Sequence, residues 1–161
     1  MEEPLYRTIT IYTLEEYQKY NKIIQNKLMK RPLILGGFMA LCLLLALLID
    51  DAPKVGIIIG VLLSPVIVPF INARMVKKAY KSNSLLQDTT SEFLFFEEHM
   101  EQHSSVGVSK VPYEKLYTIL ETPANFYMMV AKNQGFIIVK ENCDPQLINF
   151  ILGLKASPKT A

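Results

Sequence analysis

The sequence predicts an α+β membrane protein: a two-helix transmembrane hairpin followed by a small antiparallel β-sheet or barrel closed by a C-terminal helix. Two long apolar runs, a series of short strand-forming runs and an amphipathic C-terminal segment carry this prediction. The chain of 161 residues has room for the hairpin and one small domain. Hydrophobic residues make up 50% and charged residues 20%, so their local distribution decides the class of protein and not the overall composition.

Residues 1–31 predict a strand and an amphipathic helix. The run YRTITIY at 6–12 is rich in β-branched and aromatic residues, which favour a strand. Thr13 and Glu16 then form a T-x-x-E capping box, in which the hydroxyl and the carboxylate would both satisfy free N–H groups at the helix start. Apolar residues follow at three- and four-residue spacing: Leu14, Tyr17, Tyr20, Ile24 and Leu28. Such a stripe can lie on an anionic membrane surface or pack on the soluble domain, and its aromatic and aliphatic character favours the domain.

Residues 32–80 predict the transmembrane hairpin. The first span, 33–49, has no charged, amide or hydroxyl side chain, and the second span, 55–71, has Ser64 as its one polar side chain. Each span would extend roughly 26 Å, which nearly matches the hydrocarbon core of a bilayer. The turn at 50–54 is short enough to make the spans antiparallel neighbours. A buried helix pair in a soluble protein would need far more covering protein than this chain provides.

Basic residues predict the orientation of the hairpin. They lie before the first span and after the second, whereas the turn holds Asp50, Asp51 and a single lysine, Lys54. The positive-inside rule therefore predicts a multi-pass plasma-membrane protein with both termini in the cytoplasm. The basic residues expected at the inner leaflet are Lys27, Lys30, Arg31, Arg74, Lys77 and Lys78.

Prolines and glycines mark further features of the two spans. Pro65 and Pro69 lie on one face of the second span and lack the N–H groups that would bond the carbonyls of residues 61 and 65, so this helix should bend. Ordinary membrane-helix prolines are favoured over a gating hinge, because no ionisable residue lies at mid-membrane. The candidates for close helix contact, with another protein or within the hairpin, are Gly36, Gly37, Gly56 and Gly60.

The chain after the hairpin predicts a linker at 81–91, a β domain at 92–155 and a frayed tail at 156–161. Short strand-forming runs begin at Phe93, His99, Gly107, Lys115, Asn125 and Gly135. This spacing is typical of an antiparallel sheet or a small barrel. Asp144 and Pro145 indicate a helix start. The apolar face of that helix, expected to plug one end of the barrel, comprises Leu147, Ile148, Ile151, Leu152 and Leu154.

In this order, the features resemble the YcxB-like family of bacterial membrane proteins. The resemblance covers nearly the whole chain and is most specific in residues 93–97, 111–130 and 135–141. It implies an N-terminal strand and helix, a two-span hairpin and a cytoplasmic domain similar to pleckstrin-homology (PH) folds, but no reaction. The chain departs from the family where a Pro-Lys-Arg follows the last aliphatic run: it has Val139, Lys140 and Glu141 there, so only the lysine is kept.

Motifs that carry chemistry are not found. The one cluster that resembles a metal site, Glu98, His99, Glu101 and His103, lacks the H-E-x-x-H spacing and lies in a predicted strand, so we expect no zinc. The sequence has no GxSxG or nucleotide-binding fingerprint, and Cys143 has no general base near it in sequence. We therefore expect neither catalytic residues nor cofactors. A net charge of +2 without a basic stripe also argues against nucleic-acid binding.

Three function hypotheses follow. The first is a non-enzymatic, membrane-anchored interaction module whose PH-like domain binds a protein or lipid partner at the inner leaflet. The second is an immunity protein that acts through its hairpin against a membrane-active toxin or on another membrane protein. The third, a channel or transporter subunit, ranks last because the spans lack polar lining residues. The expected partners are the lipid bilayer and a membrane or cytoplasmic protein, and homo-oligomerisation is left open.

Overall fold

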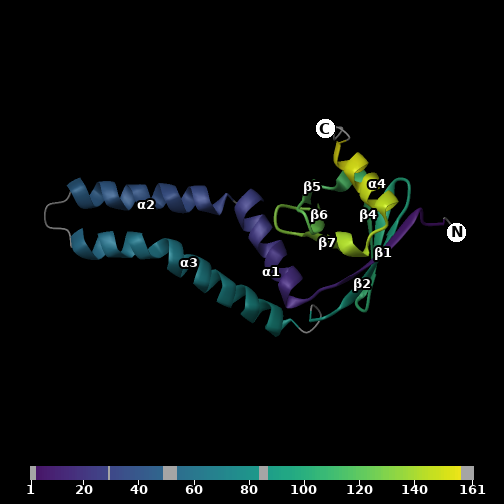
Figure 1. Ribbon diagram of the computed structural model, residues 1–161, viewed down its shortest axis with the longest axis horizontal. Helices are drawn as coiled ribbons and strands as arrows, with labels where there is room; N and C mark the ends of the chain where they lie inside the picture. The colour runs from purple at the N-terminus through teal and green to yellow at the C-terminus, as the bar shows by residue number, and fades with distance from the viewer. Residues whose placement is uncertain (1–2, 29, 49–53, 84–86, 157–161) are drawn as a thin grey trace.

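The computed structural model describes residues 3–28, 30–48, 54–83 and 87–156, so most of the predicted turn and of the tail lies outside the described residues. Figure 1 shows an arm of two long helices that projects from a β-rich domain, and both ends of the chain lie in that domain. The helices are α1 (Leu14–Ile23), π-helical η1 (Ile24–Leu28), α2 (Arg31–Leu48), α3 (Lys54–Ser82), 3-10 helices η2 (Tyr113–Lys115) and η3 (Lys140–Asn142), and α4 (Pro145–Ala156). The strands are β1 (Tyr6–Ile11), β2 (Thr90–Phe95), β3 (His99–Ser104), β4 (Gly107–Pro112), β5 (Thr118–Glu121), β6 (Asn125–Met129) and β7 (Gly135–Val139).

The strands form two small antiparallel sheets, one of four strands in the order β1-β2-β3-β4 and one of three in the order β5-β6-β7. The first sheet joins chain segments from both sides of the hairpin, because β1 pairs with β2 from Tyr6 opposite Phe95 to Ile11 opposite Thr90. This pairing moves the start of β2 into the predicted linker at 81–91, ahead of the predicted start at Phe93. Thr90 and Ser91 form backbone hydrogen bonds with β1. This pairing outweighs the preference of serine and threonine for turns.

The two sheets meet where β1 passes β7 and η3. Thr8 Oγ1 donates to the Asn142 carbonyl at 2.8 Å, and Asn142 Nδ2 donates to the Ile9 carbonyl at 2.8 Å. The backbone N–H of Val139 donates to Thr10 Oγ1 at 3.5 Å. Both threonine side chains are buried, and these hydrogen bonds satisfy their hydroxyl groups. The two sheets are thus joined here through side chains and not through backbone pairing of strands.

The main core lies between the sheets and under α4. Leu147 and Ile151 of α4 are fully buried in it, and each such side chain contributes about 1.5–3 kcal/mol through burial. The other buried members are Phe93, Phe95, Met100, Leu116, Ile119, Phe126, Met128 and Ile138. The predicted helix start at Asp144 and Pro145 is therefore confirmed. The apolar face of this helix, predicted to plug one end of a barrel, packs on the core between two separate sheets.

Glu121 at the end of β5 ties two later elements to the sheet. Its carboxylate accepts from Lys140 of η3 at 2.8 Å and from Lys155 of α4 at 2.7 Å, and these two hydrogen bonds lower the pKa of Glu121 to about 2. The ammonium of Lys140 also lies 4.3 Å from the centroid of the Phe126 ring. The lysine kept from the family pattern thus has a structural role at this corner of the domain.

The apolar face of α1 packs on the outer side of the three-stranded sheet. Tyr20, Ile24 and Leu28 contact a second cluster that includes the buried Tyr127 and Met129, and the rings of Tyr20 and Tyr127 lie 5.9 Å apart. The expectation that the stripe packs on the domain is confirmed for these three residues. Burial in this cluster raises the pKa of Tyr20 to about 12.

Only half of the predicted capping box forms at the start of α1. The Thr13 hydroxyl accepts from the N–H of Glu16 at 3.2 Å, as predicted. The Glu16 carboxylate does not return to Thr13, whose N–H donates to the Ile11 carbonyl at 2.9 Å. It accepts instead from Lys19 and from the buried amide of Asn125. A polar group buried in the sheet competes successfully for this carboxylate, because leaving that amide unsatisfied would cost about 1–3 kcal/mol.

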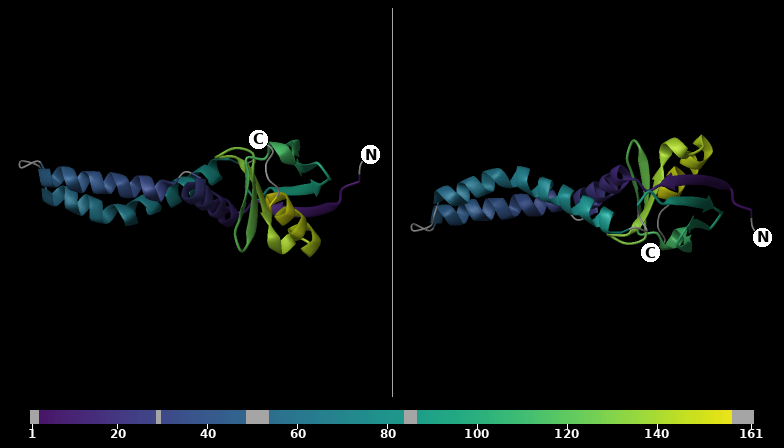
Figure 2. Two further views of the ribbon diagram at one scale, coloured as in Figure 1. Left: turned by 90° about the horizontal axis from the view of Figure 1, so that it is seen from above. Right: turned by 90° about the horizontal axis from the view of Figure 1, so that it is seen from below.

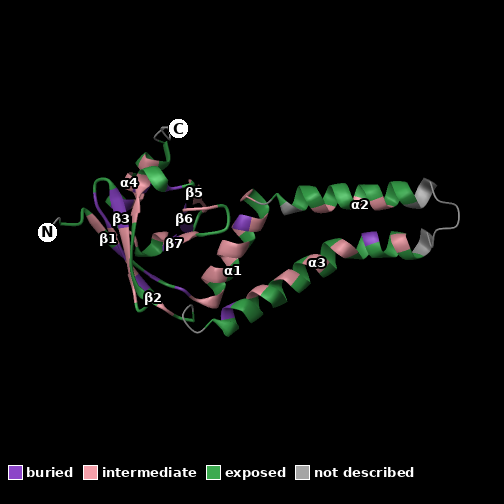
Figure 3. Cartoon of the chain, turned by 180° about the vertical axis from the view of Figure 1, so that it is seen from behind, coloured by how far each residue is buried: buried purple, intermediate pink, exposed green. Residues whose placement is uncertain are grey.

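In the hairpin, α2 and α3 contact each other along one narrow seam, and Figure 3 shows that most of their surface is exposed. The seam residues, half-buried or buried, are Leu35, Met39, Cys42, Ile57, Val61, Ser64 and Val68. A Cβ atom added at Gly36, Gly37, Gly56 or Gly60 would meet nothing within 4 Å, so these glycines do not form the contact between the helices. Of the two roles left open for them, packing inside the hairpin does not apply.

One described helix, Gly56–Ser82, is long and apolar enough to cross a membrane. Among the described residues, Leu14–Leu28 and Pro32–Leu45 meet that test only together, as a pair bent by 61°. The second helix continues beyond the predicted span of 55–71, because α3 ends at Ser82. The views in Figure 2 show the two helices leaving the domain as one arm.

The bend predicted from the prolines is visible in the middle of α3 (Figure 1). Pro65 has no N–H for the carbonyl of Val61, and the hydroxyl of Ser64 donates to that carbonyl at 2.8 Å. The one polar side chain of the predicted second span therefore satisfies a carbonyl that the proline leaves free, which is the condition for tolerating a proline in lipid.

We predict that Ser64→Ala lowers the stability of the protein in detergent micelles by about 1 kcal/mol, because the Val61 carbonyl loses its donor. In a Pro65→Ala background, which restores the N–H, the same change should cost little. Thermal unfolding of the four proteins of this double-mutant cycle measures the coupling. An equal cost in both backgrounds would show that the hydroxyl does not compensate for the proline.

Candidate functional site

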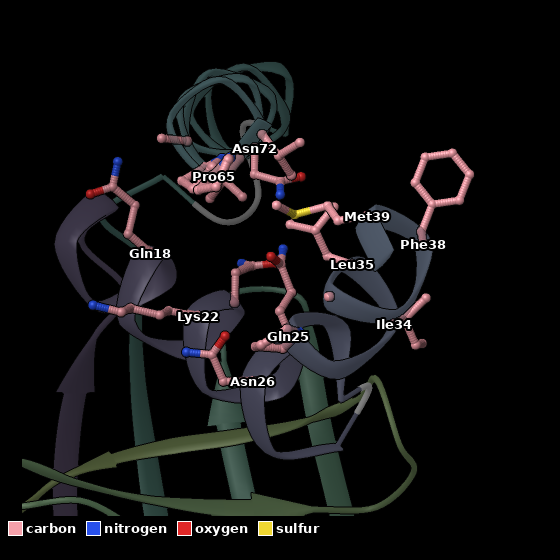
Figure 4. A pocket seen from close by; sticks show the side chains of 17 residues that line it. Gln18, Lys22, Gln25, Asn26, Ile34, Leu35, Phe38, Met39, Pro65 and Asn72 are labelled. Atoms are coloured by element: carbon pink, nitrogen blue, oxygen red, sulfur yellow. The ribbon is translucent and has the colours of Figure 1, made fainter. Parts of the chain in front are cut away.

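A cleft of about 1060 Å³ lies where α1, α2 and α3 meet (Figure 4). One wall is polar and comes from α1 and η1: Gln18, Asn21, Lys22, Gln25 and Asn26. The facing walls are mostly apolar and come from α2 and α3: Pro32, Ile34, Leu35, Gly36, Phe38, Met39, Pro65, Val68, Pro69, Asn72, Ala73 and Val76. The cleft is thus amphipathic, with polar groups on the side of the β domain and apolar groups on the side of the hairpin.

The polar wall follows from the periodicity of α1. Positions 18, 21, 22, 25 and 26 recur at three- and four-residue spacing, so they share the helix face opposite the apolar residues that contact the sheet. The apolar face is occupied by the β domain, so the polar face is directed at the base of the hairpin. Figure 4 shows Gln18, Lys22, Gln25 and Asn26 together on this side.

Two bends open the cleft. The first separates α1 from α2 and includes Lys30, which has a φ of 49°, a left-handed conformation. The Lys30 carbonyl accepts from the N–H groups of Leu33 at 3.0 Å and Ile34 at 3.2 Å and so starts α2. The second is the bend of α3, and both prolines, Pro65 and Pro69, line the cleft. Together these bends keep the three helices from closing on one another.

The charge of the cleft is positive. Lys22 is the one charged residue among those that line it, and no carboxylate does. The acidic groups of α1 are engaged elsewhere: Glu15 and Glu16 bind Lys19 at 2.8 and 2.7 Å. These hydrogen bonds raise the pKa of Lys19 and lower that of Glu15. The cleft therefore presents an ammonium and several amides without a competing anion.

Tyr80, near the end of α3, fastens the hairpin to the β domain. Its hydroxyl donates to the carbonyl of Tyr12 at 2.8 Å and accepts from the N–H of Asp88 at 2.9 Å. Its ring lies 5.7 Å from that of Tyr17 on α1. Tyr80 is 6% exposed, and burial raises the pKa of the neighbouring Tyr12 to about 12. One buried side chain thus joins α3, the start of α1 and the segment before β2.

The basic residues predicted at the inner leaflet lie around the junction of the helices with the domain. Lys30 is exposed at the first bend, Lys77 and Lys78 are exposed on α3, and the side chain of Arg31 lies outside the description. Arg74 lies over the ring of Phe70, 4.3 Å from its centroid. Lys27 points to the β domain instead, where it donates to the carbonyl of Glu121 at 3.5 Å.

The candidate glycines and prolines are divided between the exposed helix surface and the cleft. Gly37, Gly56 and Gly60 lie on the surface, whereas Gly36, Pro65 and Pro69 line the cleft.

The histidine cluster lies on the outer face of β3. Glu101 contacts His103 at 3.0 Å and His99 at 3.5 Å, and the hydrogen bond from His103 lowers the pKa of Glu101. No group of three His, Cys, Asp or Glu residues that could hold a metal ion occurs in the part of the chain that the structure describes. The Cys143 thiol donates to the Val139 carbonyl at 3.3 Å, and burial raises its pKa, which disfavours the reactive thiolate.

Sequence reasoning did not identify the cleft. The sequence-based expectations for α1 concern its cap and its apolar stripe, and the walls that face its amide residues come from α2 and α3. A signal was present in the chain, since Gln18, Asn21, Gln25 and Asn26 form a face of amides where a surface helix usually carries mixed charges.

We predict that Tyr80→Phe destabilises the junction by about 1–3 kcal/mol, because the Tyr12 carbonyl and the Asp88 N–H lose their partner in a buried place. Hydrogen exchange at Asp88 should accelerate accordingly. The matched control is Tyr17→Phe, which keeps the ring contact with Tyr80 and removes a hydroxyl without a described partner. Equal effects of the two changes would mean that the Tyr80 hydroxyl does not hold the junction.

Comparison with known proteins supports the family resemblance in the C-terminal part of the chain. Residues 95–154 match the model of a family described as YcxB-like protein, which confirms the resemblance over these residues. The match runs from the end of β2 into α4, so it covers most of the β domain and leaves out the hairpin and the N-terminal strand. Neither a curated protein nor a solved structure matches the chain.

Proposed function

We propose that this protein is a non-enzymatic, membrane-anchored interaction module that holds a PH-like β domain at the inner leaflet of the plasma membrane. The observation that carries the proposal is the exposed apolar surface of α2 and α3, joined through α1 and Tyr80 to a domain with its own buried core. The hairpin is the anchor and the β domain is the part that meets a partner.

Burial supports two membrane spans. Phe38 is 63% exposed and Val66 71%, and they belong to a larger set of exposed apolar side chains on the same helices. That set also includes Leu33, Ile34, Leu41, Leu44, Ile59, Leu62, Leu63, Phe70 and Ile71. So much apolar surface in one place is unusual for a soluble monomer, and it is favourable in lipid. With its 18 residues, α2 extends about 27 Å, close to the thickness of the hydrocarbon core.

The strand arrangement supports a PH-like domain. Four strands and three strands form two antiparallel sheets, and a C-terminal helix covers the core between them. The family resemblance implies the same kind of domain, and the family match falls on it. The seam between β1 and β7 closes one corner through side chains, as in a partly open barrel.

The position of the termini supports one orientation. β1 and α4 belong to the same domain, so both ends of the chain lie on one side of the hairpin. Exposed Lys30, Lys77 and Lys78 lie on that side, at the ends of the helices. Each would contribute about 1 kcal/mol on an anionic inner leaflet, so we place this domain in the cytoplasm.

A partner surface is offered by the outer face of the four-stranded sheet. Ile9, Glu92, His103 and Val108 form one row across it. Ile9 is 42% exposed and Val108 61%, so the row is apolar at both ends. A sheet face that stays in contact with water usually carries polar side chains. Exposed aliphatic side chains with polar groups between them are instead typical of a surface that binds another protein.

The alternative is an immunity protein that acts through its hairpin. It is favoured by one observation, that Gly36, Gly37, Gly56 and Gly60 are not used inside the hairpin and leave open surface for another membrane helix. Expression of residues 31–74 alone separates the two functions. Retained protection of cells would favour the alternative, and its loss would favour the interaction module.

We predict that alkaline phosphatase inserted after Asp51 is active, and that green fluorescent protein fused to either terminus is fluorescent. Phosphatase needs the oxidising outer compartment for its disulfides, and the positive-inside rule puts only the turn there. Phosphatase fused after Lys81 is the control and should be inactive. An active fusion at Lys81 with an inactive one at Asp51 would invert the proposed topology.

A further inference from the structure

We propose that the cleft between α1, α2 and α3 binds one anionic glycerophospholipid from the inner leaflet. Its phosphate would lie against the polar face of α1, and an acyl chain would lie along α2 and α3. The inference rests on the proposed function, since it requires the base of the hairpin to lie at the membrane boundary.

The two kinds of wall match the two parts of a lipid. Gln18, Lys22 and Gln25 belong to the helix that packs on the β domain, which places them on the aqueous side. Leu35, Met39 and Val68 belong to the hairpin. In Figure 4, Leu35 and Met39 extend toward α3, and Gln25 extends from the α1 side into the opening, whereas Lys22 and Asn26 point away from the apolar wall. A wholly apolar occupant would leave the amides without partners, and a wholly polar one would leave the hairpin wall uncovered.

The cleft is large enough for part of a lipid molecule. Its volume of about 1060 Å³ lies just above the range, roughly 300–1,000 Å³, of pockets that bury small ligands. The bends that open it lie at Lys30, where the backbone is left-handed, and in α3, where two prolines remove helix hydrogen bonds and favour a bend.

Charge selects an anion. Lys22 supplies an ammonium at the rim of the cleft, and the amide NH2 group of Gln25 supplies a neutral donor inside the opening, and both kinds of group bind phosphate oxygens. No carboxylate lines the cleft, and the two nearest on α1, those of Glu15 and Glu16, are turned to Lys19. A phosphate diester with one net negative charge, as in phosphatidylglycerol, fits this set better than a zwitterionic headgroup.

The test uses the full-length protein in mild detergent, titrated with phosphatidylglycerol or phosphatidylcholine, and counts bound lipid by native mass spectrometry. Ala73→Trp fills the cleft, and Ala79→Trp is its matched control on an exposed part of the same helix that does not line the cleft. Lys22→Ala removes the charge, and Lys78→Ala, outside the cleft, is its control.

We expect one molecule of phosphatidylglycerol bound to each protein molecule. Ala73→Trp should abolish this adduct and Lys22→Ala should weaken it about fivefold, the equivalent of about 1 kcal/mol, whereas both controls keep it. An adduct that survives Ala73→Trp would overturn the inference, as would equal binding of phosphatidylcholine or a protein dimer that Ala73→Trp dissolves. Membrane insertion of all variants, followed by extraction, is scored separately, so failure of the anchor is distinguished from failure of the lipid site.

Discussion

Two neighbouring helices can cover only one stripe of each other, and this limit governs the whole structure. In α2 and α3 the stripe consists of Leu35, Met39, Val61 and a few more residues, while most of the other described side chains between residues 33 and 71 are apolar and exposed. Nothing else in the described chain packs over that surface. Water would be an unfavourable solvent for this surface, and the proposed function therefore places it in lipid, which in turn requires that backbone groups be satisfied within the helix. The bond from Ser64 to the carbonyl left free by Pro65 meets this requirement.

The second feature is the double use of α1. Its apolar face completes the core of the three-stranded sheet, and its polar face lines the cleft at the base of the hairpin. Glu16 shows how closely the two are joined, since its carboxylate binds Asn125 in the sheet and Lys19 on its own helix. With Tyr80 bonded on the other side, the domain is held at a defined position relative to the hairpin. Under the proposed function, a domain held in this way would meet its partner at the membrane without a flexible tether.

Local patterns in the sequence were sufficient for the elements but not for their partners. The two apolar runs, the Thr13 cap, the Asp144 helix start and the strand starts at His99, Gly107, Asn125 and Gly135 all rest on neighbouring residues, and the structure agrees with them. The predicted strand starts at Phe93 and Lys115 are wrong: β2 begins at Thr90, and Lys115 ends the 3-10 helix η2, so that β5 begins at Thr118. The pairing of β1 with β2 does not rest on neighbouring residues, because the hairpin separates these strands in the chain. The Glu16 carboxylate was assigned to its own helix end, whereas its partner Asn125 is distant in sequence. The cleft was missed for the same reason, since its walls are joined only when the bends at Lys30 and Pro65 are known.

The most direct test of the account is to measure whether lipid or water surrounds the exposed face of the hairpin. Spin labels at Phe38 and Val66, with Cys42 and Cys143 replaced by alanine, report by power saturation in phosphatidylglycerol-containing vesicles whether oxygen or a water-soluble nickel complex reaches them. The account predicts high oxygen and low nickel accessibility at both positions, and the reverse at Lys78 on the exposed end of α3. Nickel accessibility at Phe38 and Val66 as high as at Lys78 would contradict the claim that lipid covers this surface.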